Sequence, residues 1–249
     1  MTTPKDPVPV LTLSETGSTN AEARSRAEEG QVGPLWITAL RQTAGRGRRG
    51  RVWEDAGGNL AATLLMTTTL PPAKAAQVSF VAALAVADLT DHYLGQALAR
   101  LKWPNDVLVE GKKISGILVE SGTRPDGRLW LAVGIGVNLA SPPLTPDRPA
   151  AALAEFLENQ APSQVEVMAI LNQTFDHWLT KWMSDGFDPI ARAWTARAHG
   201  LGQACTARLG HETVEGIAEG LDPDGALRLR LADGHIRCIS AGDVFFGDA

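Results

Sequence analysis

The sequence predicts an α/β protein of the α+β kind, in which helices pack on a mixed β-sheet and a small β-barrel follows. Up to about residue 200, apolar runs of strand length alternate with stretches of helical periodicity. From Gln203 to Phe246 only short strand-like runs separated by turns remain, which is the pattern of a small barrel. A chain of 249 residues is long enough for one large domain and a satellite. We therefore expect a first domain at 1–200 and a second at 201–249.

The first third of the chain predicts three strands, one helix and a long loop. Apolar runs bounded by turn-forming residues place the strands at Val8–Leu13, Leu35–Leu40 and Leu60–Met66. The helix follows the first strand, with Thr19 as its cap, Glu22 at the spacing of a capping box and Gly30 at its end. The loop, residues 42–59, is too long for a simple connector and is expected to be functional or mobile.

The middle of the chain predicts a buried helix followed by strands. Pro71 and Pro72 open a helix that continues to about Tyr93 and is apolar on most faces, as expected of a buried helix. A glycine–lysine turn at residues 111–112 joins two of the strands into a hairpin. The strands are expected at Leu98–Lys102, Val107–Glu110, Ile114–Ser121 and Leu129–Leu139.

The last third predicts helices and then the barrel strands. A proline-rich connector, Ser141–Pro149, precedes three helices, of which the longest has an amphipathic pattern. The helices are expected at Ala151–Glu158, Val165–Met183 and about Pro189–Ala198. Turn signals then separate five short strands, expected at residues 204–209, 214–221, 226–231, 235–240 and 243–246.

Composition and charge exclude several classes of protein. Hydrophobic residues make up 44% and charged residues 20% of the chain, which excludes disorder, collagen and coiled coil as its main state. The net charge of −5 does not favour attraction to nucleic acid or to an anionic membrane. Cys205 and Cys238 are the only cysteines, too few for a disulfide framework or a four-cysteine zinc site. The sequence shows no signal-peptide pattern and no uncharged apolar stretch of roughly 20 residues. The expected location is therefore the cytoplasm.

The segment Gly45–Arg51 carries four arginines and three glycines, and several interpretations are open. Its glycines fit the dinucleotide pattern G-x-G-x-x-G, but no helical pattern follows and no acidic residue lies about 20 positions on. A nucleic-acid patch is a second interpretation, although the rest of the chain is acidic and no aromatic residue interrupts the cluster. A mobile loop that grips an anionic small molecule is a third, because arginines match phosphate and carboxylate oxygens. A solvated loop without a ligand is the fourth.

Three further segments place polar residues beside buried strands. Lys102–Asp106 puts Asn105 and Asp106 at a strand end, where Asp106 binds Mg²⁺, orients an amine or caps a turn. Lys113 begins a strand that is otherwise buried, and its side chain either reaches solvent or contacts an anion. Gly134–Asn138 includes two glycines within an apolar strand, which leave room for a flat ligand or allow close helix packing.

Together these residues resemble biotin–protein ligases, and the matching blocks occur in that family's order. The resemblance covers roughly residues 10–140 strongly and the C-terminal barrel more loosely. It implies a catalytic domain like those of class II synthetases and lipoate–biotin ligases, with a small SH3-like barrel after it. Because the first block begins at residue 17, we expect no N-terminal helix-turn-helix domain and hence a monofunctional ligase. The blocks are Gly17–Asn20, Gln42–Arg51 with Trp53, Lys102–Asp106, Lys113–Glu120 and Gly134–Leu139.

The resemblance also implies which residues hold the substrates. The catalytic residues are expected to be Lys113, Arg48 and Asp106. Biotin is expected to contact Ser18, Thr19, Asn20, Gln42, Gly45, Arg46, Gly47, Arg48, Lys113 and Gly116. ATP is expected to contact Arg46, Arg48, Arg49, Arg51, Trp53, Asn105, Lys113, Gly136 and Asn138. Mg²⁺ is expected to accompany ATP, and no metal ligands are identified.

The reaction implied by the resemblance activates biotin with ATP as biotinyl-5′-AMP and transfers it to a lysine of a biotin carboxyl carrier protein. Asp106 is expected to orient or deprotonate that lysine, and residues 45–55 are expected to become ordered over the adenylate. Two alternatives are a lipoate–protein ligase and a non-catalytic nucleic-acid-binding module. An exposed sheet edge can pair with a second copy or with the carrier protein, so both a monomer and a homodimer are compatible with the sequence.

Overall fold

Two β-sheets organise the protein, whose computed structural model describes residues 7–54, 57–143, 149–158 and 160–247. The larger sheet has seven strands in the order β1-β2-β3-β7-β6-β5-β4, and the smaller has five in the order β11-β10-β9-β8-β12. In the larger sheet β1 and β2 run parallel, and the remaining neighbouring pairs in the described residues are antiparallel. The predicted mixed sheet is therefore confirmed.

Every strand expected in the first domain is present, with shifted ends. The longest, β6, extends beyond its expected range in both directions, and it pairs with β7 from Ser115–Val137 to Thr123–Leu129. The strands are β1 (Val10–Leu13), β2 (Leu35–Ala39), β3 (Leu60–Thr68), β4 (Arg100–Lys102), β5 (Asp106–Val109), β6 (Lys112–Thr123) and β7 (Leu129–Val137).

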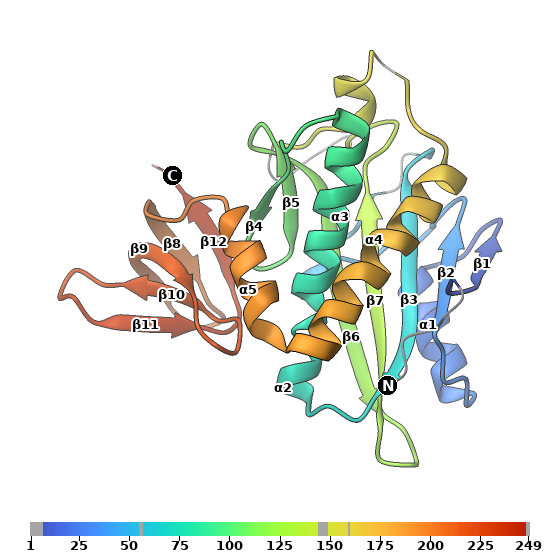
Figure 1. Ribbon diagram of the computed structural model, residues 1–249, viewed down its shortest axis with the longest axis horizontal. Helices are drawn as coiled ribbons and strands as arrows, with labels where there is room; N and C mark the ends of the chain where they lie inside the picture. Colours follow the sequence, from blue (N-terminus) through green and yellow to red (C-terminus); the bar gives the residue numbers. More distant parts are fainter. Residues whose placement is uncertain (1–6, 55–56, 144–148, 159, 248–249) are drawn as a thin grey trace.

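Helices cover the two faces of the larger sheet unequally. The helices α3 (Val78–Leu94) and α4 (Gln164–Asp185) lie in front of the sheet in Figure 1, and α1 (Thr19–Glu28) lies behind it. Side chains of β7 point alternately to the two faces of the sheet. Val133 and Ile135 belong to the hydrophobic cluster that contains α3, whereas Ala132 belongs to the cluster that contains α1. The face behind the sheet is the less covered of the two, and the candidate site lies on it.

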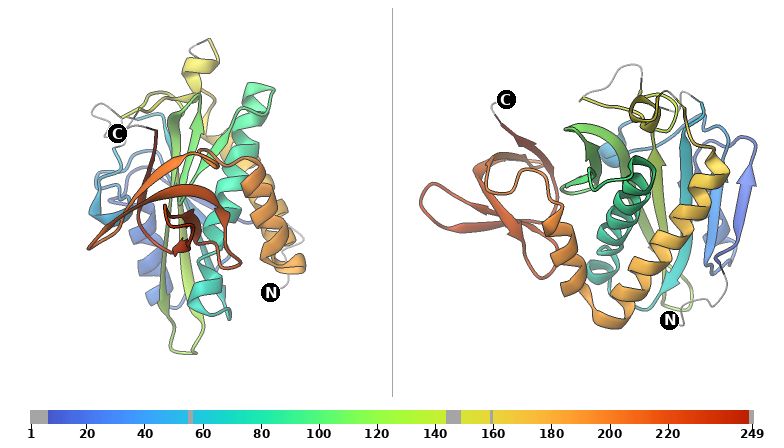
Figure 2. Two further views of the ribbon diagram at one scale, coloured as in Figure 1. Left: turned by 90° about the vertical axis from the view of Figure 1, so that its left-hand side faces the viewer. Right: turned by 45° about the horizontal axis from the view of Figure 1, so that its top comes forward.

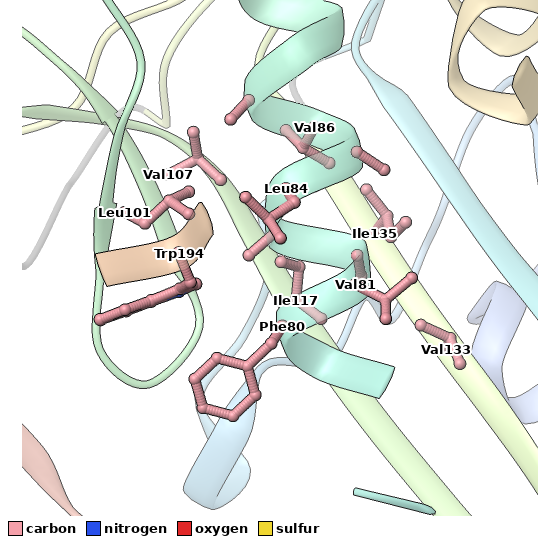
Figure 3. Close-up of a cluster of buried hydrophobic side chains, with 14 of the residues drawn as sticks. Phe80, Val81, Leu84, Val86, Leu101, Val107, Ile117, Val133, Ile135 and Trp194 are labelled. Atoms are coloured by element: carbon pink, nitrogen blue, oxygen red, sulfur yellow. The ribbon is translucent and has the colours of Figure 1, made fainter. Parts of the chain in front are cut away.

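The main core forms where α3 crosses the central strands. Figure 3 shows Leu84 of α3 pointing toward Leu101 and Val107 of the sheet, and Phe80 lying beside Trp194 from α5 (Phe187–Ala196). Trp194 is 2% exposed, and its ring lies edge-on to Phe80 at a centroid distance of 5.6 Å. Burial of large apolar side chains stabilises by about 1.5–3 kcal/mol each, so this layer holds the sheet rigid beneath the site.

The start of α1 differs from the expectation. Ser18 rather than Thr19 is the N-cap, and the Ser18 side chain makes no capping hydrogen bond. Thr19 is the first helical residue, and its hydroxyl lies 3.1 Å from Oε1 of Gln42. Glu22 pairs with Arg26 at 2.7 Å instead of closing a capping box. The predicted cap was wrong because the Thr19 hydroxyl is turned toward the candidate site.

Three other helices also differ from the expectation. The long helix expected after Pro71 is divided into α2 (Pro72–Ala75) and α3. The helix expected at 151–158 is reduced to a short 3₁₀ turn, Leu153–Phe156, and α5 begins two residues before Pro189. Within the expected connector 141–149, residues 144–148 lie outside the described part of the chain.

The C-terminal sheet has the five strands expected from the turn signals. Figure 2 shows it as a separate layer beside α5. Its core is continuous with that of the first domain, and the indole nitrogen of Trp103 donates a hydrogen bond to the Gly225 carbonyl at 3.1 Å. The strands are β8 (Ala204–Arg208), β9 (Thr213–Leu221), β10 (Leu227–Arg230), β11 (Ile236–Ile239) and β12 (Asp243–Phe246).

The segment Pro72–Leu94 is long and apolar enough to cross a membrane by length and composition alone. However, 72% of its most apolar window is buried inside the fold, where it provides the central helix. Core helices of folded proteins meet the same criterion, so the segment is weak evidence for a membrane protein.

Candidate active site

A cavity of about 430 Å³ lies on the α1 side of the larger sheet, a size typical of small-molecule sites. Its walls come from the start of α1, the arginine loop (residues 45–54), the centre of β6 and β7, and the first residue of β12. The lining residues are Ser18, Thr19, Asn20, Gln42, Arg46, Gly47, Arg48, Arg51, Val52, Trp53, Glu54, Ala61, Asn105, Asp106, Lys113, Gly116, Ile117, Leu118, Gly134, Ile135, Gly136, Asn138, Pro143, Ala150 and Asp243.

One end of the cavity is built from uncharged hydroxyl and amide groups. Ser18, Thr19 and Asn20 are each 4% exposed. Gln42 accepts a hydrogen bond from the Thr19 backbone N–H at 2.8 Å. The hydroxyl of Thr63 lies 2.8 Å from Oγ1 of Thr19 and 2.7 Å from Oδ1 of Asn20. These bonds fix the orientation of the polar groups, so this end is preorganised for a ligand with its own donors and acceptors.

Glu120 joins this polar end to the arginine loop, and sequence reasoning did not select it as a site residue. Its Oε2 accepts hydrogen bonds from Nδ2 of Asn20 at 2.8 Å and from Nη2 of Arg46 at 3.0 Å. Glu120 is the last residue of one of the blocks that resemble the family. Its position opposite Ala132 on β7, however, follows only from the pairing of the strands. The carboxylate therefore fixes both the amide and the first arginine of the loop.

The arginine loop is a tight turn held by its own backbone. The Gly47 N–H donates to the Arg51 carbonyl at 2.8 Å, and the Trp53 N–H donates to the Gly45 carbonyl at 3.0 Å. Arg49 sits at the tip with a φ of 57°, a left-handed conformation that a residue with a Cβ adopts at a cost of roughly 1–2 kcal/mol. Tertiary contacts must hold such a conformation in place.

Three arginines of this loop are bound by groups from outside it. Arg48 donates to Oδ1 of Asn105 at 3.1 Å and to the Gly242 carbonyl at 3.3 Å. Arg51 and Arg49 both form ion pairs with Asp243, the latter at 3.4 Å. Burial lowers the pKa of the Arg48 guanidinium, and the nearby carboxylates of Asp243 and Asp106 partly oppose that effect. The cationic end of the cavity is thus lined by arginines with fixed positions.

Lys113 adds a further cation at the same end. Its ammonium lies 2.6 Å from Oδ1 of Asp106, and their side chains are 27% and 8% exposed. The same ammonium lies 5.8 Å from the ring centroid of Trp53, within the range of a cation–π interaction. Lys113 therefore faces the cavity as a fixed cation and does not extend to solvent.

The glycines of β6 and β7 make room for protein side chains, which corrects the expectation of space for a flat ligand. A Cβ on Gly136 would lie 2.4 Å from the Trp53 ring, and one on Gly134 would lie 2.1 Å from Oδ1 of Asn20. Gly116 is paired with Gly136 across the two strands, and a Cβ there would lie 3.1 Å from Trp53. The indole of Trp53 thus lies directly on this glycine pair.

Asn138 is mainly a structural residue on the cavity wall. It is 2% exposed, and its Nδ2 donates to the Ala151 carbonyl at 3.0 Å. Its Oδ1 is buried without a hydrogen-bond partner among the described residues, which leaves one acceptor for a ligand or a water molecule.

Most predicted site residues meet at this one cavity. Gly45 and Arg49 do not line it: Gly45 packs against the Trp53 backbone, and Arg49 turns toward the Arg208 carbonyl and Asp243. Sequence reasoning missed Asp243, which lies almost 200 residues from the loop, and no local signal could have found it. The predicted residues that line the cavity are Ser18, Thr19, Asn20, Gln42, Arg46, Gly47, Arg48, Arg51, Trp53, Asn105, Asp106, Lys113, Gly116, Gly136 and Asn138.

In the part of the chain that the structure describes, the acidic groups around the cavity do not form a metal cage. The described residues contain no group of three or more His, Cys, Asp or Glu side chains that could hold a metal ion. Glu54, Asp106 and Asp243 border the cavity from three separate segments. This donor set fits a hard cation only if a substrate supplies most of its oxygen ligands, as phosphates do for Mg²⁺.

The fold and the cavity define a class of protein. An uncharged polar end next to a cluster of four cations suits a substrate with a neutral polar head and a carboxylate, placed against a polyphosphate. This is the arrangement of an enzyme that activates an acid with a nucleotide.

The chain belongs to the biotin/lipoate A/B protein ligase family, whose pattern matches residues 15–139. Residues 200–247 match the biotin protein ligase C terminal domain. The chain is 44% identical to the biotin–(acetyl-CoA-carboxylase) ligase of Paracoccus denitrificans over 241 residues, which are 94% of this chain and 99% of that one. It is 32% identical to the enzyme of the same name from Mycobacterium tuberculosis, covering 93% and 86% of the two chains. The biotin protein ligase of Aquifex aeolicus, solved in complex with biotin and ATP, superposes with a TM-score of 0.78 at 27% identity, covering 96% of this chain and 99% of that one.

Proposed function

We propose that the protein is a biotin–protein ligase that makes biotinyl-5′-AMP from biotin and ATP and transfers the biotinyl group to a lysine of a biotin carboxyl carrier protein. The observation that carries this proposal is a single cavity in which buried hydroxyl and amide groups lie beside Arg46, Arg48, Arg51 and Lys113. The named relatives support it, because they are ligases that biotinylate a carboxylase. So does the Aquifex aeolicus enzyme, which holds biotin and ATP together.

The uncharged end is the place for the ureido ring of biotin. That ring presents two N–H donors and one carbonyl acceptor, which need partners of both kinds when they are buried. The hydroxyls of Ser18 and Thr19 and the amide of Gln42 offer such partners. Biotin bound in this orientation extends its valeryl chain along β6 and β7 toward Lys113, so that its carboxylate enters the cationic end.

The first step joins this carboxylate to the α-phosphorus of ATP. A carboxylate oxygen forms the new P–O bond, the bond between the α-phosphorus and the oxygen that bridges to the β-phosphate breaks, and pyrophosphate leaves. Two anions must approach each other, so the residues that matter most are the fixed cations Arg48 and Lys113. Arg46 and Arg51 complete the set on the loop side.

The second step transfers the acyl group to the carrier lysine. The amine attacks the acyl carbon, the bond from that carbon to the phosphate oxygen breaks, and AMP leaves. A free lysine has a pKa of about 10.4 and must lose a proton before it attacks. Asp106 lies 2.6 Å from Lys113. When a phosphate of the substrate binds Lys113 in place of Asp106, the carboxylate of Asp106 pairs instead with the ammonium group of the incoming carrier lysine.

Magnesium enters the proposal as part of the nucleotide. Carboxylates that border the cavity singly suit an ion that arrives on phosphate oxygens and keeps several water ligands. An ion bound there would neutralise phosphate charge, and Asp106, which lies beside Lys113, is the carboxylate that would help to hold it.

The arginine loop protects the intermediate. An acyl-adenylate hydrolyses when water reaches it, so a loop that covers it raises the yield of transfer. We expect residues 45–55, of which residue 55 lies outside the described part of the chain, to be less accessible to proteases when biotin and ATP are bound, because the substrates add partners to arginines that the protein already holds in place. Equal cleavage with and without the substrates contradicts this role.

The test of the proposed function is biotin-dependent exchange of labelled pyrophosphate into ATP, with lipoate and octanoate as comparison acids. Lipoate is included because the matching family contains both biotin and lipoate ligases. Exchange with biotin alone supports the proposal, and exchange with lipoate in its place makes the protein a lipoate ligase. Folded protein that exchanges with no acid but binds DNA or RNA in a salt-dependent manner contradicts it in favour of a nucleic-acid-binding module.

A further inference from the structure

Asp243 belongs to the C-terminal sheet, yet its carboxylate lies on the wall of the cavity in the first domain. It is the first residue of β12, and its side chain is 15% exposed. It forms an ion pair with Arg51 and a second one with Arg49 at 3.4 Å. The carbonyl of the preceding residue, Gly242, accepts a hydrogen bond from Arg48 at 3.3 Å. One corner of the C-terminal domain therefore contacts three arginines of the loop.

These contacts are the main external anchor of the loop tip. Among the described residues, the tip is otherwise held by its own backbone turn, by the bond from Arg48 to Asn105 and by the bond from Arg49 to the Arg208 carbonyl in the C-terminal sheet. The left-handed Arg49 makes the tip conformation costly. The guanidinium side chains of Arg49 and Arg51 are 41% and 39% exposed, whereas Asp243 is largely buried. The carboxylate is thus the buried member of these ion pairs, and each guanidinium keeps an exposed part.

We propose that Asp243 is a positioning residue that latches the arginine loop over the cavity before the substrates bind. In this role the carboxylate occupies the forked donors of Arg51 as a phosphate would, because both anions offer oxygens with matching geometry. Asp243 keeps its ion pairs while the polyphosphate of ATP binds the remaining N–H donors of the loop arginines, so the loop is already in place when ATP arrives. The identity of ATP as the ligand rests on the proposed function, whereas the latch in the ligand-free protein does not.

The direct test is Asp243→Asn, which keeps the shape of the side chain and removes its charge. Hydrogen–deuterium exchange of the amides of residues 47–53 is measured in the ligand-free protein and again with biotin and ATP. We expect faster exchange in the ligand-free variant and a smaller difference once the substrates are bound. The KM for ATP should rise roughly 10- to 150-fold, the usual effect of losing a hydrogen bond to a charged group, with kcat changed by less than roughly 3-fold.

Two control variants separate a latch from a general loss of stability. Glu219→Gln removes the ion pair with Arg230, which lies within the same C-terminal sheet and away from the loop. It should leave both loop exchange and the KM for ATP unchanged. Asp243→Glu keeps the charge and should recover most of the loop protection that Asp243→Asn loses.

The arginine side of the latch gives an independent measurement if Asp243→Asn does not fold. Arg51→Gln should raise loop exchange in the ligand-free protein, and adding Asp243→Asn to it should raise that exchange by less than Asp243→Asn does alone, because the Arg51–Asp243 ion pair is already lost and only the pair with Arg49 remains to be removed. Loop exchange identical to that of the unmodified protein overturns the proposal, and so does a lowered KM for ATP, which would make the carboxylate a competitor of ATP. If the unmodified protein shows no biotin-dependent pyrophosphate exchange, the proposed function fails, and the ligand-free measurements still decide whether the latch exists.

Discussion

The ammonium of Lys113 and the carboxylate of Asp106 form an ion pair of 2.6 Å on the wall of the cavity. Both residues come from one hairpin, in which β5 and β6 shift register between Val107 and Leu108. The shift places the lysine and the aspartate side by side facing the same cavity. The pair thus supplies one group for each half of the proposed reaction, a cation for the phosphate and a carboxylate for the incoming amine.

Replacing the two members of this pair should separate the half-reactions. Lys113→Gln should lower the rate of biotinyl-AMP formation by roughly 10²- to 10³-fold, the usual effect of losing a group that stabilises developing negative charge. Asp106→Asn should slow the transfer to the carrier protein more than adenylate formation. Single-turnover measurements of each step check both expectations. Lys112→Gln is the matched control, because Lys112 is the exposed neighbour on the same strand. If Lys112→Gln slows adenylate formation as much as Lys113→Gln does, the assignment of Lys113 is wrong.

Removing Arg48 should release the intermediate. Arg48 ties the loop to Asn105 and to the C-terminal domain, so Arg48→Gly should open the cavity and let biotinyl-AMP escape to label lysines of bystander proteins such as albumin. Biotin incorporated into albumin, measured by blotting, should rise several-fold. Arg41→Gly is the control, since Arg41 is outside the cavity and forms an exposed ion pair with Glu15, away from the C-terminal domain. If both variants biotinylate albumin to the same extent, Arg48 has no special role in retaining biotinyl-AMP.

Local residue patterns predicted the strands, most of the helices and the five-stranded tail, whereas the residues on the cavity wall were predicted from the resemblance of short sequence blocks to a known family. Strand periodicity and turn signals are properties of short segments, and the polar residues of the site lie at the ends of such segments. Local patterns could not predict the contacts of Glu120 and Asp243 with the arginine loop, or the contact of the Trp53 ring with Gly136. Each depends on which distant strands become neighbours, and a single chain without its sheet order does not determine that.

The contact of Trp53 with Gly136 predicts a steric test. A Cβ on Gly136 would lie 2.4 Å from the indole, so Gly136→Ala should displace the ring and with it the end of the arginine loop. We expect the free energy of unfolding to fall by about 1–3 kcal/mol, the usual range for overpacking, and biotin to bind more weakly in a calorimetric titration. In a Trp53→Ala background the same glycine substitution should cost much less, because the clash is gone. Gly210→Ala serves as control, since a Cβ there meets nothing within 4 Å. Full additivity of Gly136→Ala and Trp53→Ala would show that the ring does not depend on the glycine.

His199 at the junction of the two domains predicts a dependence of stability on pH. Burial lowers its pKa, and the positive charge of Lys102 lowers it further. Its ring packs edge-on against Phe246 at a centroid distance of 5.6 Å. Because the pKa is lower in the folded protein than the value of about 6.5 in the unfolded chain, the unfolded chain binds more protons between these two values. The contribution of His199 to stability is therefore complete above about pH 6.5 and is lost as the pH falls through the folded pKa.

A neutral substitute should reduce this loss. The Tm of His199→Gln should fall less between about pH 7.5 and pH 5 than that of the unmodified protein, because glutamine takes up no proton. Thermal unfolding followed by circular dichroism at both pH values measures the difference. His235→Gln is the matched control, since His235 lies in a turn of the C-terminal sheet with its side chain 83% exposed. If the two variants lose the same Tm on acidification, protonation of His199 is not what weakens the junction, and other groups of the chain are responsible.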